Sequence, residues 1–321
     1  MTRILLTARW PQAVEAELAR RFEVAFNPDD HPFSREELKQ ALQNYEIVCP
    51  TVVDPLDREM LSVEPLRCRL LANFGVGVNH IDLETARKRG ITVTNTPGVL
   101  TDCTADLAMT LLLMTARRAG EGERLVRAGR WQGWRPTQLL GTNVTGKTLG
   151  IVGMGRIGRA VARRARHGFG MRILYVHPRP LAPEDLAGLE AQACDSLDAM
   201  LPQCDFVSIH CPGGAKNYHL IDADRLSRMK PGSFLVNTAR GDVVDTDALI
   251  AALDHGPLRG AGLDVHENEP NVDPRLLQRE DVVLLPHLGS ATQETREAMG
   301  RRVLANLTAF LAGREPPDRV V

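Results

Sequence analysis

A glycine-rich turn set between an apolar run and a helical pattern constrains this chain most. Gly153, Gly155 and Gly158 have GxGxxG spacing. The flanking segments predict a strand, a helix and a second strand, at Leu149–Val152, Ile157–Arg166 and Arg172–Val176. In such a unit the first glycine permits a tight bend, the second lets the backbone approach a pyrophosphate, and the third allows close helix–strand packing. The helix N-terminus also favours an anion. The segment therefore predicts dinucleotide binding rather than a purely structural turn.

The overall composition excludes several other classes of protein. A length of 321 residues suggests two domains, and 43% hydrophobic with 25% charged residues is typical of a soluble globular protein. A formal net charge of -1 indicates neither nucleic-acid nor membrane binding. The apolar run within Met1–Trp10 is too short for a signal peptide, and no stretch is long enough to span a bilayer. Six cysteines without CxxC or zinc spacing favour a reduced, cytoplasmic protein without a metal site.

Short apolar runs alternate with helical patterns along the chain, which is typical of parallel sheets covered by helices. Before residue 99 the runs predict strands at Ile4–Leu6, Val24–Phe26, Ile47–Val48, Leu70–Phe74 and Ile91–Val93. Helix-forming composition lies between them at Glu15–Arg21 and Arg35–Leu42. Beyond the glycine-rich turn, the predicted strands are Arg172–Val176, Phe206–His210, Phe234–Asn237, Leu258–Leu263 and Val282–Leu284.

Two further helical patterns bear on the division into domains. A long one runs from Thr101 to Arg127 and contains the apolar block Leu107–Met114. It has more apolar surface than an exposed connector should have, which favours a homodimer built on it. A closing helix is predicted at Thr292–Leu311. If it covers the first sheet, the first domain is discontinuous; a helix that stays with the neighbouring domain is the alternative.

The predicted fold is therefore α/β, with two doubly wound parallel-sheet domains. We expect a discontinuous, flavodoxin-like substrate domain made of residues 1–99 and 288–321, and a Rossmann nucleotide domain made of residues 100–287. The active site is expected in the cleft between them, because open α/β sheets bind ligands at the carboxyl ends of their strands.

Three segments each place an ionisable side chain just after a predicted strand. Arg240 has a planar guanidinium that matches a carboxylate, although a surface arginine before a turn is the alternative. Glu269 lies in an acidic loop that could simply be solvated, and His287 could be structural. Together they supply what a 2-keto acid reductase needs. Arg holds the carboxylate, His protonates the carbonyl oxygen, and a nearby carboxylate orients that His and raises its pKa.

The chain resembles the D-isomer-specific 2-hydroxyacid dehydrogenases over essentially its whole length. The motifs are the run Gly75–Asp82, the glycine-rich turn, and the segments Asn-Thr-Ala-Arg-Gly, Asn-Glu-Pro and Pro-His-Leu-Gly-Ser-Ala that contain the three residues above. Leu-Leu-Gly at 139–141 and the passage from Trp131 to Pro136 are most similar to glyoxylate/hydroxypyruvate reductases. The resemblance implies NAD(P)H-dependent reduction of a small 2-keto acid such as glyoxylate or hydroxypyruvate.

The resemblance also implies roles for individual residues. Arg240, Glu269 and His287 become the catalytic trio, and Arg240 shares the substrate carboxylate with the backbone of Val76 and Gly77. Trp134 either reaches into the neighbouring subunit's site or is a packed loop aromatic. The remaining implied contacts are Asp264 with the nicotinamide carboxamide, Thr104 near the cofactor phosphate, and Val52 and Val53 as pocket walls placed by analogy.

The second strand of the nucleotide unit bears on which cofactor is used. NAD enzymes usually place Asp or Glu at its end, whereas this chain has His177, followed by Arg179. These residues could attract a 2′-phosphate, so NADPH is predicted over NADH, with a plain surface turn as the alternative. Arg156 is expected at the pyrophosphate or the 2′-phosphate, and His210 on the adenine side. Further expected cofactor contacts are Ile157, Cys211, Pro212, Thr238, Ala239, Gly289 and Ser290.

Other functions remain open from the sequence alone. Phosphoglycerate, D-lactate and formate dehydrogenases share the predicted fold. Phosphoglycerate enzymes often have an additional regulatory domain, and we expect none here. Transcriptional corepressors that resemble this family keep Arg, Glu and His while binding partner peptides, so a nucleotide-sensing interaction protein is the alternative from another class. No role is expected for the remaining histidines without a partner pattern, which are His80, His167, His219 and His255.

Overall fold

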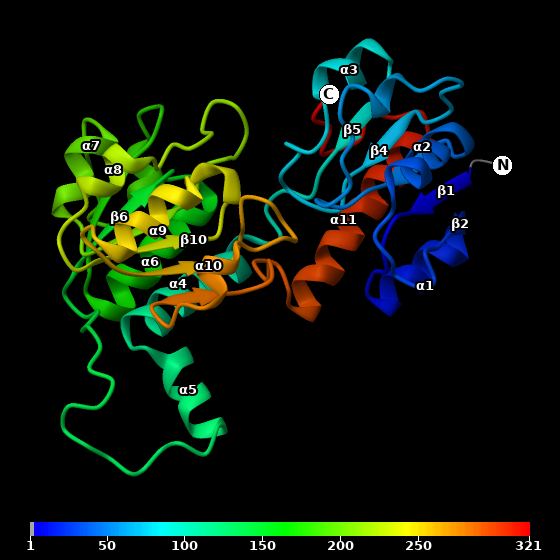
Figure 1. Cartoon of the computed structure of the whole chain (residues 1–321). Coiled ribbons are helices and arrows are strands. Elements are labelled where there is room, and N and C mark those ends of the chain that lie inside the picture. Colours follow the sequence, from blue (N-terminus) through cyan, green and yellow to red (C-terminus); the bar gives the residue numbers. More distant parts are fainter. Residues whose placement is uncertain (1–2) are drawn as a thin grey trace. The chain divides into compact units, whose positions relative to one another are not determined.

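The computed structural model describes residues 3–321, which form two compact units (Figure 1). Unit 1 comprises the described residues up to Leu100 together with Ala291–Val321, and unit 2 comprises Thr101–Ser290. The domain boundaries predicted from the sequence, after residue 99 and before residue 288, lie within a few residues of these transitions. Met1 and Thr2, where the short N-terminal run begins, lie outside the described residues.

Unit 1 is built on a five-stranded parallel sheet with the order β2-β1-β3-β4-β5. The strands are β1 (Arg3–Leu6), β2 (Glu23–Ala25), β3 (Ile47–Cys49), β4 (Leu70–Ala72) and β5 (Thr92–Thr94). The helices are α1 (Gln12–Arg21), α2 (Arg35–Asn44), α3 (Leu83–Lys88), α11 (Gln293–Leu311) and the 3-10 turn η1 (Met60–Ser62).

The closing helix α11 packs on unit 1 because its apolar face completes the core there. Met299, Val303 and Leu307 are buried against residues of the first sheet and of α1. A Cβ atom added to Gly300 would lie 2.6 Å from Val14 Cγ1, so the two helices are in close contact at that point. The sequence expectation of a closing helix is met, with Thr292 as its N-cap.

Unit 2 contains a seven-stranded parallel sheet with the order β12-β11-β10-β9-β6-β7-β8. Its strands are β6 (Thr148–Val152), β7 (Arg172–Val176), β8 (Gln192–Ala193), β9 (Phe206–Ile209), β10 (Ser233–Asn237), β11 (Leu258–Leu263) and β12 (Val282–Leu284). Its helices are α4 (Thr101–Ala116), α5 (Ala119–Arg127), α6 (Arg156–Phe169), α7 (Leu197–Met200), α8 (Ala223–Ser227), α9 (Thr246–Asp254) and α10 (Pro274–Leu277), with 3-10 turns η2 (Pro183–Leu186), η3 (Leu201–Gln203) and η4 (Gly241–Val243). The predicted α/β fold with two parallel sheets is confirmed.

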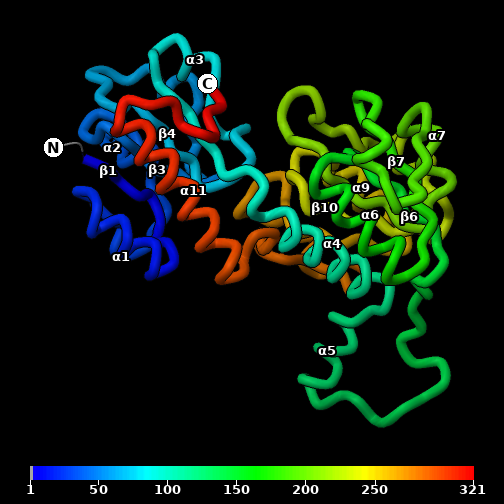
Figure 2. The backbone as a smooth tube through the Cα atoms, turned by 180° about the vertical axis from the view of Figure 1, so that it is seen from behind, coloured from blue at the N-terminus to red at the C-terminus, as the bar shows by residue number. Residues whose placement is uncertain are grey.

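The prediction of one continuous helix from Thr101 to Arg127 is wrong. The helix stops after Ala116, whose carbonyl accepts a hydrogen bond from the N–H of Thr142, and Arg118 adopts a left-handed backbone with φ of 55°. The whole apolar block lies in α4, which packs in the core of unit 2. By contrast, α5 has no buried residue, and Figures 1 and 2 show it and the loop after it extending away from the sheet of unit 2.

Among residues 3–321, no helix combines the length and the apolar character that a membrane crossing requires.

Candidate active site

The glycine-rich turn joins the interior strand β6 to α6, and the structure requires glycine at two of its three glycine positions. Gly153 has a φ of +96°, and a Cβ there would lie 2.7 Å from the backbone nitrogen of Cys211. A Cβ on Gly158 would overlap the carbonyl oxygen of Gly153. Around Gly155, which caps α6 without a side-chain hydrogen bond, a Cβ would meet nothing within 4 Å. This open cradle at a helix N-terminus fits a dinucleotide pyrophosphate.

Two further segments flank this cradle. His177 and Arg179 lie exposed just beyond the end of β7, and Arg156 is exposed at the start of α6. After β9, burial lowers the pKa of His210 to about 3, and its Nε2 lies 2.9 Å from the Ser208 hydroxyl. Burial likewise raises the pKa of the Cys211 thiol to about 11. The residues after β9, on one side of the cradle, are therefore uncharged at neutral pH. The residues after β7, on the other side, include the cationic Arg179.

Arg240 follows β10 in a turn that the side chain of Asn237 closes. Asn237 Nδ2 donates to the Arg240 carbonyl at 2.8 Å, and Asn237 Oδ1 accepts from the N–H of Ala239 at 3.0 Å. A Cβ on Gly241 would overlap the backbone of His266, so this turn packs directly on the loop after β11. Burial lowers the pKa of Arg240, and the nearby carboxylate of Glu269 opposes that shift.

Glu269 and His287 form the ion pair at the centre of the candidate site. Glu269 Oε2 lies 2.8 Å from His287 Nδ1, and its Oε1 accepts the N–H of His266 at 2.9 Å. Burial opposes ionisation of Glu269, but the hydrogen bond and charge of His287 and the amide of His266 outweigh it, so the Glu269 pKa is lowered. The carboxylate therefore stays charged at neutral pH beside the imidazole ring.

Asp264 fixes the backbone that presents His287. Consecutive N–H groups of His287, Leu288 and Gly289 donate to the Asp264 carbonyl, Oδ1 and Oδ2, at 2.9, 2.6 and 2.8 Å. Asp264 is fully buried, and His287 is held in a left-handed conformation with φ of 56°. The Thr104 hydroxyl donates to the Gly289 carbonyl at 2.8 Å. Both Asp264 and Thr104, expected to contact the cofactor, thus support the His287 loop.

The left-handed backbone of His287 is of a kind that persists where surrounding contacts determine it, and such backbone is common at functional sites.

The other predicted cofactor residues of unit 2 lie along the same strand ends. Thr238 and Ala239 precede Arg240, Pro212 follows Cys211, Ser290 follows Gly289, and Ile157 lies in the first turn of α6.

In unit 1, amide side chains hold the turn that contains Val76 and Gly77. Asn95 Nδ2 donates to the Val76 carbonyl at 2.9 Å, and Asn73 Nδ2 donates to the Gly77 carbonyl at 3.0 Å. His80 Nε2 lies 3.2 Å from Asn73 Oδ1, so this histidine has a partner that its sequence context did not reveal.

The structure corrects or refines the sequence predictions for several other residues. Trp134 is 80% exposed in the loop after α5, so it is not a packed aromatic within its own subunit. Val52 is partly buried and Val53 is 63% exposed. His219, for which the sequence indicated no partner, contacts Glu267 at 2.7 Å. A sequence cannot reveal this pair because the two residues lie in separate loops.

Comparison with known proteins identifies the family. Residues 109–289 match the model for the NAD binding domain of D-isomer specific 2-hydroxyacid dehydrogenases. A glyoxylate reductase of Thermococcus litoralis is 44% identical over 322 residues, which cover 99% of this chain and 96% of that protein. The chain belongs to the D-isomer specific 2-hydroxyacid dehydrogenase family. The resemblance inferred from its motifs is thereby confirmed.

Crystal structures of other dehydrogenases share the fold of this one over its whole length. A glyoxylate reductase from Paecilomyes thermophila has a TM-score of 0.87 and 35% identity, covering 99% of this chain and 98% of that one. An NADPH-dependent glyoxylate/hydroxypyruvate reductase from Sinorhizobium meliloti, in complex with NADP and malonate, has a TM-score of 0.87 and 36% identity, covering 100% and 97%.

Proposed function

We propose that this dehydrogenase reduces glyoxylate and hydroxypyruvate to their 2-hydroxy acids, with NADPH as the preferred hydride donor. The contact of 2.8 Å between Glu269 and His287, beside the buried guanidinium of Arg240, is the main support. The names of the T. litoralis relative and of the S. meliloti structure support the substrate class, and the latter also supports the cofactor.

The chemistry follows from what each side chain can do. The glycine-rich turn after β6 would hold a nicotinamide dinucleotide, which when bound would supply a hydride for the carbonyl carbon of the keto acid. Arg240 binds the substrate carboxylate through its planar guanidinium, with the backbone of Val76 and Gly77 as the predicted second contact. His287 Nδ1 is engaged by Glu269, so Nε2 is the atom that donates a proton to the carbonyl oxygen. The carbonyl thus gains one hydride and one proton, and the imidazole recovers its proton from solvent.

A variant of His287 tests the proton-donor role. His287→Ala should bind NADPH with nearly wild-type affinity, because the proposed cofactor cradle lies after β6, but its turnover of glyoxylate should fall by orders of magnitude. Wild-type turnover in this variant would contradict the role. If instead the wild-type chain bound NADPH tightly but turned over no member of a keto-acid panel, a nucleotide-sensing protein would be favoured.

The cofactor preference rests on the end of β7. His177 stands where a carboxylate would repel a 2′-phosphate, and Arg179 lies exposed two residues later. Steady-state kinetics with NADPH and NADH at one glyoxylate concentration should give the higher kcat/KM with NADPH. A higher value with NADH would refute the preference.

We also propose a homodimer that uses α5 and the following loop rather than α4. Large apolar side chains are exposed there, with Val126 at 59%, Trp131 at 54%, Trp134 at 80% and Leu140 at 56%. Such a patch on a single chain is typical of an interface. Light scattering at micromolar concentration should return a dimer mass, and replacing both tryptophans by Ser should shift it toward the monomer. A wild-type monomer would refute the proposal.

A further inference from the structure

His219 connects the two segments that contain the proposed catalytic side chains. Its backbone N–H donates to the Asp242 carbonyl at 2.8 Å, two residues beyond Arg240. Its ring Nε2 lies 2.7 Å from Glu267 Oε1, two residues before Glu269. One residue therefore holds the Arg240 turn through its backbone and the Glu269 loop through its side chain.

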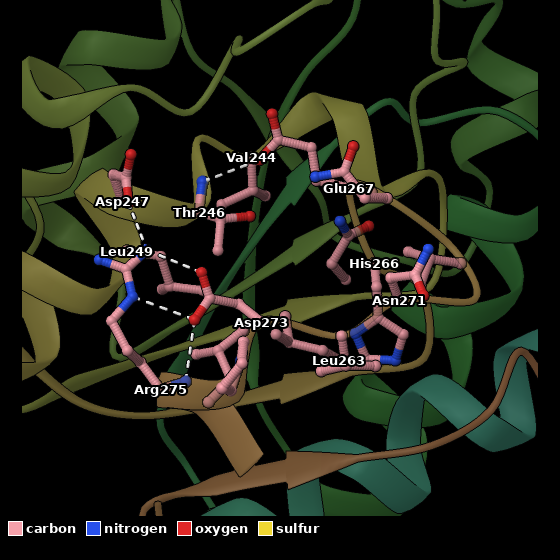
Figure 3. A pocket seen from close by; sticks show the side chains of 17 residues that line it. Val244, Thr246, Asp247, Leu249, Leu263, His266, Glu267, Asn271, Asp273 and Arg275 are labelled. Carbon is pink, nitrogen blue, oxygen red and sulfur yellow. Dashed lines mark hydrogen bonds and ion pairs between the residues drawn. The ribbon is translucent and has the colours of Figure 1, made fainter. Parts of the chain in front are cut away.

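Glu267 anchors the other end of this connection. Its Oε2 accepts the N–H of Thr246 at 3.3 Å, at the N-terminus of α9, where Figure 3 shows the two residues facing each other. Burial raises the pKa of Glu267, but hydrogen bonds from Thr246 and His219 outweigh that effect, and the pKa is lowered. The carboxylate is thus charged and held by a helix terminus as well as by the imidazole.

The loop that contains Glu269 packs on the Arg240 turn at His266, but packing does not fix it on every side. A cavity of about 430 Å³ lies beside it, lined in part by His266, Glu267, Asn268 and Asn271 (Figure 3). Protein interiors resist displacement because they are close-packed, and a loop beside a void lacks that constraint. The directed contacts of Glu267 must therefore provide much of the restraint on this side.

The backbone of His219 indicates that its position is imposed by its surroundings. Its φ of 47° lies in the left-handed region, which only a few per cent of residues other than glycine adopt. The ring stacks on Tyr218, with centroids 3.9 Å apart. Its Nδ1 lies 3.6 Å from Asp245 Oδ2. A strained residue held by this many contacts is more consistent with a positioning role than with an incidental loop residue.

We propose that His219 and Glu267 are positioning residues that hold the Glu269–His287 pair at a fixed place relative to Arg240. The inference rests on the proposed roles of Arg240, Glu269 and His287. Proton transfer depends steeply on such alignment, and a displacement of about 1 Å can reduce a rate by about a hundredfold. Loss of the connection should therefore affect kcat more than cofactor binding.

The test compares His219→Phe, Glu267→Leu and the double variant. Phe keeps a ring that can stack on Tyr218 but removes both nitrogens. We expect kcat for glyoxylate to fall about ten- to hundredfold in each single variant, with the Kd for NADPH unchanged. The double variant should lose no more than either single one, because both break the same contact. His219→Gln, which restores an N–H donor, should recover part of the rate.

The pH profile separates positioning from simple loss of stability. If Glu269 moves away from His287, the alkaline decline of kcat/KM should shift to lower pH in His219→Phe, as it should in Glu269→Gln. The titratable groups that face the His219 ring are Glu267, Asp245 and Tyr218, and those that interact with His287 are Glu269 and Asp264. His255→Gln, an exposed histidine at the other end of α9, is the matched control and should change nothing.

Three results would overturn the inference. The first is a folded His219→Phe variant with wild-type kcat. The second is a fall in the kcat of His219→Phe without any change in its pH profile of kcat/KM. The third is a loss of kcat in the double variant that equals the product of the losses in the two single variants. Failure of the proposed function looks different, because Glu269→Gln would then leave both the rate and the pH profile unchanged. If Glu269→Gln is impaired and His219→Phe is not, only the positioning role is lost.

Discussion

Replacing Glu269 by Gln removes the charge beside His287 while keeping the size of the side chain and one hydrogen-bond acceptor. The hydrogen bond and charge of His287 contribute to the lowered pKa of Glu269, and this part of the interaction is reciprocal, so removing the carboxylate disfavours the charged form of its partner. Reduction of a keto acid requires the proton of that charged form. The alkaline limb of the pH dependence of kcat/KM should therefore move to lower pH in the variant.

The size of this shift can be worked out from the exposure of the pair. The two side chains retain 29% (His287) and 26% (Glu269) of their accessible surface, so the effective dielectric lies between that of water and that of a partly buried site. For unit charges about 4 Å apart, these limits correspond to roughly 1 and 4 kcal/mol. A middle value of about 2 kcal/mol is well above the precision of a pH–rate profile, so the displacement of the alkaline limb should be resolved.

The assay is steady-state reduction of glyoxylate by NADPH across the neutral and alkaline range, with the midpoint of the alkaline limb as readout. Glu23→Gln is the control, because Glu23 is exposed on the edge strand β2, and its profile should match that of the wild type. A Glu269→Gln enzyme whose alkaline limb stays in place would show that the carboxylate does not set the protonation of His287.

Four further variants have expected outcomes. Gly155→Ala should leave the melting temperature unchanged but weaken NADPH binding about tenfold or more, because the added Cβ would enter the open cradle. Gly158→Ala should instead lower the free energy of unfolding by about 1–3 kcal/mol, since the added Cβ would overlap the backbone of Gly153. Asp264→Asn leaves one loop amide without an acceptor, so thermal unfolding should show a loss of about 2 kcal/mol, or roughly 5 °C. Arg179→Ala should lower kcat/KM for NADPH about tenfold and leave the NADH value unchanged; equal losses with both cofactors would contradict its proposed contact.

The strands could be predicted from the sequence because both faces of each parallel sheet are buried. The runs at Leu258–Leu263 and Val282–Leu284 match β11 and β12 residue for residue. The glycine-rich turn was equally informative, since Gly153 and Gly158 each answer a steric or conformational requirement that no other residue meets as well, and Gly155 leaves the cradle open. Local patterns of this kind need no knowledge of distant parts of the chain.

Features that depend on distant contacts could not be predicted in this way. The helix predicted from Thr101 to Arg127 is broken because Thr142, far along the chain, bonds to the last carbonyl of α4. The role of Asp264 as an acceptor for three consecutive amides requires the loop after β12 to fold back onto the loop after β11. The pair formed by His219 and Glu267 likewise depends on two loops meeting, and each residue alone resembles a solvated polar side chain.

The sheet order explains why residues so far apart in sequence form one site. Arg240, Glu269 and His287 follow β10, β11 and β12, which are consecutive neighbours in the parallel sheet, so their carboxyl ends lie at one edge. The glycine-rich turn follows β6, whose two neighbours are β7 and β9, so the chain runs outward in opposite directions from this strand. Open α/β sheets bind ligands at the carboxyl ends of their strands at such a switch point, and there Gly153 closely approaches Cys211. A pyrophosphate bound there and a carbonyl group held near His287 would lie along the same edge of one sheet. The topology of unit 2 therefore accounts for both halves of the proposed reaction.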